Sequence, residues 1–92
     1  MPDNTHTDAV AVQIAAMLAR ILAKPSVSPD DDFFELGGDS LTATELMVAI
    51  EVQYGVVIDP VEVFEQPKIR QFARMVADLS PTPRPVTYRV VR

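Results

Sequence analysis

Residues 30–54 read DDDFFELGGDSLTATELMVAIEVQY, and this stretch decides the fold. An acidic run, two phenylalanines and a glycine pair lead into a segment whose apolar residues recur at three- and four-residue steps. That spacing predicts a helix over residues 40–54 with one buried face, and Gly55 is suited to end it. The residues of the inward face are Ala43, Leu46, Met47, Ile50 and Tyr54. Ser40 therefore stands at the start of an amphipathic helix.

Three further helices are expected around this one. The first covers residues 7–23 and is ended by Lys24-Pro25, because proline disfavours the helical conformation in the residue before it. Its inward residues are Val10, Ile14, Met17 or Leu18, and Ile21. A short third helix begins at Asp59-Pro60, with Val61 and Phe64 facing inward.

The fourth helix is expected over residues 68–79, after the break at Gln66-Pro67. Its inward residues are Ile69, Phe72, Ala73, Val76 and Leu79. Residues 56–58 are taken as extended packing, since no second strand is available to pair with them before the tail. The sequence thus predicts an all-α fold: a small four-helix antiparallel bundle of three main helices and a short third one. Phe33 and Phe34 are expected to anchor its long first loop.

The chain divides into three parts. Residues 1–6 are expected to be a flexible leader, residues 7–79 one domain, and residues 80–92 a proline-rich tail or linker. The tail is either a flexible end or a segment that docks on this domain or a neighbour. A domain this small holds a modest core and no deep enclosed pocket. A freestanding protein and a domain excised from a larger synthase remain alternatives.

Charge and composition exclude several classes of function. All thirteen acidic residues lie within the first eighty positions, whereas the last twelve carry three arginines and no acid. An acidic domain of this kind repels nucleic acid and favours partners with basic surfaces. No apolar stretch is long enough for a membrane span. The absence of cysteine excludes disulfides and thiolate chemistry, and it suits the cytoplasm.

Ser40 has three interpretations from the residues alone. Asp39 or Ser40 could cap the helix, and Thr42 with Glu45 resembles a capping box. A nucleophilic serine needs a base within reach, yet His6 is the only imidazole and lies far upstream. The third interpretation is a serine that another enzyme modifies: the glycines leave it open, and a helix start favours phosphate.

No metal site is expected in the acidic run. Counted from Asp30, a calcium loop needs glycine at the sixth position and glutamate at the twelfth, where this chain has Glu35 and Leu41. A solvated acidic loop is the better interpretation.

The block from Asp32 to Leu41, DFFELGGDSL, resembles the 4′-phosphopantetheine attachment signature of carrier proteins, especially peptidyl carrier domains. The resemblance extends over about residues 10–79. It implies a carrier-protein-like fold with no catalytic residues, in which Ser40, flanked by Gly38 and Asp39, receives phosphopantetheine from coenzyme A. A separate Mg²⁺-dependent phosphopantetheinyl transferase performs that step. The arm then carries aminoacyl, peptidyl or acyl thioesters between biosynthetic enzymes.

The resemblance also implies partners. Adenylating or loading, condensing and tailoring enzymes would dock in turn beside the serine, on a monomeric carrier that binds neither nucleic acid nor membrane. The candidate contact residues are Leu41, Thr44, Glu45, Val48, Glu62 and Glu65. Many peptide-elongating carriers have histidine where this chain has Asp39, so peptidyl and acyl cargo both stay open. The alternative function is an unmodified acidic helical adaptor that binds other proteins.

Overall fold

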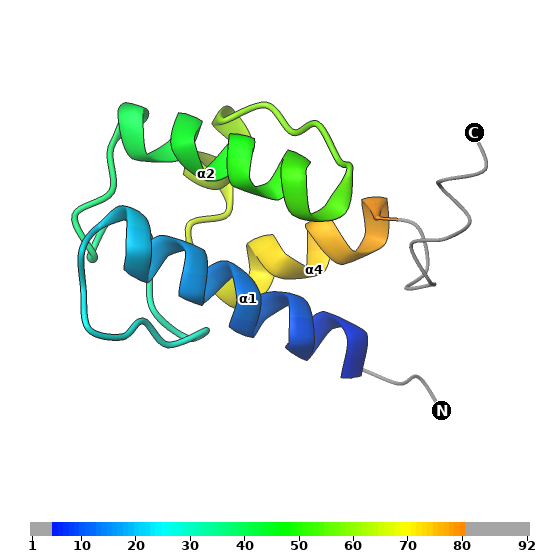
Figure 1. The fold of residues 1–92 in the computed structure, drawn as a ribbon, viewed down its shortest axis with the longest axis horizontal. Helices are drawn as coiled ribbons and strands as arrows, with labels where there is room; N and C mark the ends of the chain where they lie inside the picture. Colours follow the sequence, from blue (N-terminus) through cyan, green and yellow to red (C-terminus); the bar gives the residue numbers. More distant parts are fainter. Residues whose placement is uncertain (1–4, 81–92) are drawn as a thin grey trace.

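The computed structural model describes residues 5–80, which form four helices (Figure 1). They are α1 (Thr5–Ile21), α2 (Ser40–Tyr54), α3 (Val61–Glu65) and α4 (Ile69–Leu79). Within the described part no strand occurs, and one isolated antiparallel bridge joins Asp32 and Lys68. The predicted all-α fold with a short third helix is confirmed. Over the same residues, no helix combines the length and apolarity that crossing a membrane requires.

Helix α1 contacts both of the other long helices. It packs against both α2 and α4, and it runs antiparallel to each of them (Figure 1). Helices α2 and α4 therefore begin at one end of the bundle and finish at the other. The long connection from α1 to α2 carries the acidic run and the glycine pair. The glycine pair lies directly before the start of α2. Asp30, at the beginning of the acidic run, instead shares Arg70 of α4 with Asp8 of α1.

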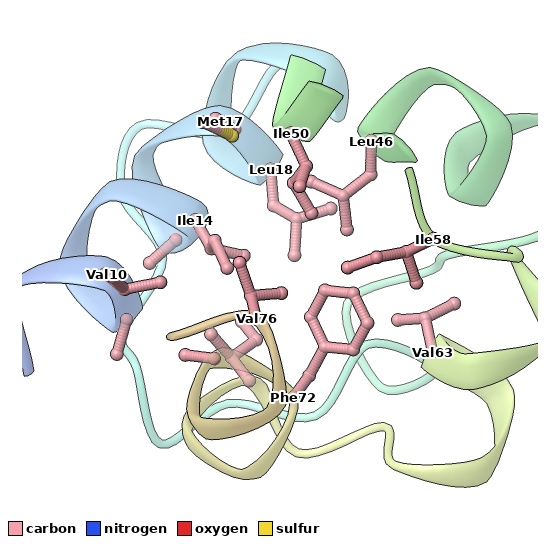
Figure 2. Close-up of a cluster of buried hydrophobic side chains, with 14 of the residues drawn as sticks. Val10, Ile14, Met17, Leu18, Leu46, Ile50, Ile58, Val63, Phe72 and Val76 are labelled. Carbon is pink, nitrogen blue, oxygen red and sulfur yellow. The ribbon is translucent and has the colours of Figure 1, made fainter. Parts of the chain in front are cut away.

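Apolar side chains from all four helices form a single core. In Figure 2 the ring of Phe72 lies among Ile58, Val63 and the side chains of α1 and α2. Every predicted inward residue of α2 except the half-buried Tyr54 is buried, as are those of α4 up to Val76. Residues 56–58 form neither a helix nor a strand, and they pack on the core with Val56 and Ile58 buried and Val57 exposed. The buried residues of α1 are Val10, Ala11, Ile14, Ala15, Met17 and Leu18.

Helix α1 begins and ends two residues earlier than predicted. It starts at Thr5, so Thr5 and His6 belong to the helix and not to a leader. It ends before Ala23, which adopts a left-handed φ of 57°. The amide of Lys24 then donates to the carbonyl of Ala19 at 2.8 Å, a Schellman-type ending formed without glycine. The remaining leader residues 1–4 and the tail 81–92 lie outside the described residues, and the predictions made for them stay predictions.

Two predicted inward residues are wrong. Val61 is 44% exposed, and Val63 is the buried residue of α3. A five-residue helix offers too few apolar positions to define its inner face, so its packing decides which residue is buried. Leu79 is also exposed, because it is the last residue of α4 and extends beyond the core.

Candidate functional site

Ser40 is the first residue of α2 and is exposed. Asp39 precedes it with an extended backbone and caps the helix. The Asp39 carboxylate Oδ1 accepts hydrogen bonds from the backbone N–H and the hydroxyl of Thr42, each at 2.9 Å. Among the described residues the Ser40 hydroxyl has no hydrogen-bond partner. Of the two capping candidates Asp39 is therefore the cap, and Ser40 is left available.

The cap also fixes the charge next to Ser40. Hydrogen bonds from the backbone N–H and then the hydroxyl of Thr42 lower the pKa of the Asp39 carboxyl below its usual value. The carboxylate stays ionised at neutral pH and is already engaged with Thr42, so it is a poor base for the Ser40 hydroxyl. His6 belongs to the first turn of α1, at the opposite end of the bundle from Ser40 (Figure 1). A serine hydrolase is therefore excluded on geometry as well as on sequence.

The two glycines before Ser40 have different roles. Gly37 has a φ of 94°, a left-handed conformation that glycine adopts without strain. Gly38 lies directly on the ring of Phe33, and a Cβ built on it would be 2.4 Å from the Phe33 Cζ. We expected both glycines to clear space beside Ser40. Gly38 instead allows the close approach of a buried ring beneath the backbone.

Backbone hydrogen bonds hold this segment against the start of α4. The amide of Phe33 donates to the carbonyl of Pro67 at 2.8 Å, and the amide of Ile69 donates to the carbonyl of Asp31 at 3.0 Å. The amide of Gly38 donates back to the carbonyl of Phe33 at 2.9 Å. The residues that lead to Ser40 are therefore held both by hydrogen bonds to the start of α4 and by a hydrogen bond within the loop. They do not form a flexible connection.

Three phenylalanines join the same segment to α3. The rings of Phe34 and Phe64 stack with centroids 5.6 Å apart, and Phe33 meets Phe34 edge to face at 5.5 Å. Phe33 is fully buried, whereas Phe34 is 48% exposed. Of the two predicted anchors, Phe33 is a core residue and Phe34 forms a partly open aromatic surface.

The carboxylates of the acidic run each have a partner. Asp30 pairs with Arg70 at 2.9 Å, and this hydrogen bond and charge lower the pKa of Asp30. Asp31 accepts from the amide of Ser28, and Asp32 accepts from the amides of Phe34 and Glu35. The run is therefore engaged in local structure and not merely solvated. No group of three potential metal ligands occurs within residues 5–80.

The candidate partner contacts lie on two helices. Leu41, Thr44, Glu45 and Val48 are exposed on the outer face of α2. Glu65 is exposed and Glu62 half-buried on α3, which is linked to the site through Phe64. Helical spacing places Val52 on the same outer face as Leu41 and Val48, but Val52 was not among the candidate contacts. It is the most exposed large apolar residue of the described part of the chain, at 82%. The open side of Phe34 was missed, because Phe34 was expected only to anchor the loop.

The chain matches a known family over most of its length. Residues 12–76 match the family described as "Phosphopantetheine attachment site". The chain is 31% identical over 84 residues to the polyketide synthase PksL of Bacillus subtilis, covering 84% of this chain and 2% of that protein. It is 38% identical over 72 residues to a linear gramicidin synthase of Brevibacillus parabrevis, covering 78% of this chain and 1% of that one. The chain thus spans a small fraction of these relatives.

Two solved structures have the same fold. BlmI, a type-II acyl carrier protein from Streptomyces verticillus involved in bleomycin biosynthesis, aligns with a TM-score of 0.76 at 27% identity, covering 82% of this chain and 90% of BlmI. A chain from the structure of the phosphopantetheine transferase Sfp in complex with coenzyme A and a peptidyl carrier protein aligns with a TM-score of 0.72 at 28% identity. That alignment covers 84% of this chain and 95% of the matched chain.

Proposed function

Because this chain belongs to the phosphopantetheine-attachment family of carrier domains, we propose that Ser40 is the residue that receives 4′-phosphopantetheine from coenzyme A. Carrier domains of this family are substrates of other enzymes and are not themselves catalysts. The observation that carries the assignment is the exposed Ser40 hydroxyl, without a hydrogen-bond partner in the described chain, on a segment fixed from beneath by Phe33 and Gly38.

The residues around Ser40 fit a covalently attached phosphate. Modification breaks no hydrogen bond of the Ser40 side chain, since Asp39 performs the capping. The positive end of the α2 dipole favours negative charge at this position. Ser40 and the neighbouring Leu41 are both exposed, so another protein can reach the Ser40 hydroxyl. When bound, the group supplies a thiol at the end of a long arm, on which acyl chains are held as thioesters.

The chemistry requires a partner enzyme. For a phosphodiester to form at Ser40 Oγ, the hydroxyl proton must leave, and the nucleotide part of coenzyme A must depart as the leaving group. The ionised Asp39 is bonded to Thr42, and His6 is at the other end of the bundle. The base and the Mg²⁺ ion are therefore supplied by a phosphopantetheinyl transferase. The similarity to a peptidyl carrier protein crystallised with such a transferase supports this partner.

We propose further that the arm carries aminoacyl, peptidyl or acyl intermediates in nonribosomal peptide or mixed peptide and polyketide assembly. The relatives named as a linear gramicidin synthase and a polyketide synthase support that range of cargo. Adenylating, condensing and tailoring enzymes would bind the outer face of α2 and the acidic residues of α3. A small mixed patch of this kind suits weak contacts that exchange in turn.

The test is intact-protein mass spectrometry after incubation with coenzyme A, Mg²⁺ and a broad-specificity transferase. We expect the wild-type chain and Ser26→Ala, a matched loop serine, to gain one phosphopantetheine group. Ser40→Ala should gain none. Absence of the gain in wild type, with a known carrier modified in the same reaction, would favour the alternative of an unmodified adaptor domain. A gain that persists in Ser40→Ala would place the attachment elsewhere.

We also propose a monomer that works in the cytoplasm. The absence of cysteine supports a reducing compartment, and the negative charge of the domain opposes self-association. Light scattering of the purified chain and fractionation of the native host test these two points. A stable dimer, or recovery in a membrane or secreted fraction, would contradict them.

A further inference from the structure

Charge is divided sharply between two parts of this chain. Residues 25–67 contain ten acidic residues and no lysine or arginine, whereas the tail, residues 81–92, contains Arg84, Arg89 and Arg92 and no acid. Opposite charges on one chain attract each other at high effective concentration.

The outer face of α2 offers a surface of matching chemistry. Leu41, Val48 and Val52 are 69%, 58% and 82% exposed and share one side of the helix. Glu45 and Glu51 are exposed beside them. Neither glutamate takes part in an ion pair within residues 5–80, where all the ion pairs involve Arg70. This face is apolar and acidic, and no other described element covers it.

The tail combines the complementary features. Val86, Tyr88 and Val90 alternate with Thr87 and Arg89, which provides apolar groups and positive charge over a short length. It follows Ser80, at the end of α4, and α2 and α4 finish at the same end of the bundle (Figure 1). Twelve extended residues reach about 40 Å, whereas the fifteen residues of α2 span about 22 Å. The tail is therefore long enough to run back along α2.

We propose that residues 81–92 dock on the outer face of α2 of the same molecule. The arginines lie near Glu45 and Glu51, and the apolar residues of the tail cover Val48 and Val52. Each exposed ion pair contributes little, so the docked tail exchanges readily with the undocked one. The docking stands by itself, whereas its consequence, that partner enzymes must displace the tail to reach Ser40 and α2, rests on the proposed function.

Paramagnetic relaxation NMR on the full, unmodified chain tests the docking. Because the chain has no cysteine, Thr87→Cys provides one site for a nitroxide label and keeps every tail charge. Relative to the same sample after the label is reduced, we expect the largest loss of amide signals around Val48 and Val52. The loss should be smaller on α1, which lies behind α2. Arg84→Glu/Arg89→Glu/Arg92→Glu should restore the α2 signals, as should about 0.5 M NaCl, since salt screens exposed charges. The matched variant with three lysines should retain the loss.

Three outcomes would overturn the proposal. The label could leave all signals of the described helices unchanged, or it could act on α1 in place of α2. In a mixture of ¹⁵N-labelled wild type and spin-labelled ¹⁴N protein, the label could broaden the α2 signals to the same extent, which would show that the contact forms between molecules. The last result would mean that the face binds a second copy.

A rate measurement separates this proposal from the proposed function. The three-glutamate tail variant should accept phosphopantetheine several-fold faster than wild type in the reaction described above, and the three-lysine variant should match wild type. Equal rates in all three would overturn the competition with partners. If no variant is modified at Ser40, the proposed function fails while the NMR result still decides the docking.

Discussion

The segment beneath Ser40 and the outer face of α2 are neighbours in sequence, yet they differ in burial and in the contacts that their side chains make. Beneath the serine, Phe33 is fully buried, Gly38 lies on its ring and Asp39 is bonded to Thr42. On the outer face, Glu45 and Val48 are exposed and unengaged by the rest of the described chain. A carrier needs both properties, since a partner must find the serine in a defined place and leave again. Substitutions in the buried segment should therefore lower stability, whereas substitutions on the exposed face of α2 should impair function.

The largest effect is expected for Phe33→Ala. Removing a fully buried aromatic ring from a packed core costs about 3–5 kcal/mol of unfolding free energy. Phe34→Ala is the matched control: its ring is about half exposed, so the loss should be clearly smaller. Urea denaturation of both variants measures the difference. Equal losses would mean that the two rings share one structural role, and the comparison between buried and open regions would fail here.

Gly38→Ala should follow in size. The added Cβ would lie 2.4 Å from a ring that has no free space, so overpacking should cost about 1–3 kcal/mol. In the double variant Gly38→Ala/Phe33→Leu, the smaller leucine side chain leaves room for the methyl group added at position 38. Its loss should be less than the sum of the two single losses, because the atoms nearest to the added Cβ all belong to the Phe33 ring. Strict additivity in urea denaturation would show that the contact is not the cause.

Asp39 should contribute a pH-dependent part of the stability. Its pKa in the folded state lies below the reference value of 3.8, so its contribution is fully present above that value. The contribution is lost as the pH falls through the lower folded-state pKa. Asp39→Asn keeps an acceptor for Thr42 but cannot titrate. The difference in thermal midpoint between wild type and Asp39→Asn should therefore shrink between neutral pH and about pH 2; a constant difference would contradict the cap's charge dependence.

The smallest effects on stability are expected on the outer face. Ser40→Ala and Glu45→Lys should each change the unfolding free energy by less than about 0.5 kcal/mol, because neither side chain makes a contact that holds the fold. Measured with the three tail arginines replaced by glutamine, so that a docked tail does not compete, both should nevertheless reduce function. Ser40→Ala should abolish modification and Glu45→Lys should slow it. Asp78→Lys, an equal charge reversal on α4, is the control and should be modified at the wild-type rate. A large destabilisation by Glu45→Lys would make that residue structural.

The sequence predicted the regular parts of the fold well. Helix α2 has the predicted bounds because fifteen residues of clear periodicity, an acidic cap and Gly55 agree with one another. The end of α1 was displaced because Ala23 adopts a conformation that its side chain does not signal. The inner residue of α3 was wrong because a single turn has no measurable period. The spacing of apolar residues was sufficient to predict a helix and its buried face where the spacing repeats over several turns.

The candidate site was predicted in part. The motif pointed to Ser40, and the choice of cap between Asp39 and Ser40 required coordinates, since both residue types form caps. The close contact of Phe33 with Gly38, and the bond from Phe33 to Pro67, depend on tertiary packing that no local pattern contains. The exposure of the candidate contact residues was inferred from helical spacing. It is confirmed for the four residues of α2 and for Glu65, whereas Glu62 of α3 is half-buried. Their role as partner contacts stays a prediction.

The backbone bonds between the loop and the start of α4 have a consequence for the order of folding. Phe33 bonds to Pro67, and Ile69 bonds to Asp31, so each pair closes a chain segment of more than thirty residues. Contacts this distant in sequence pay a loop-closure entropy and form after local helices. During synthesis on the ribosome, Ser40 therefore emerges well before its support can assemble. A nascent chain that ends before Ile69 lacks the residues that hold the segment before Ser40 in place. We therefore expect Ser40 to become a substrate only after α4 has been synthesised.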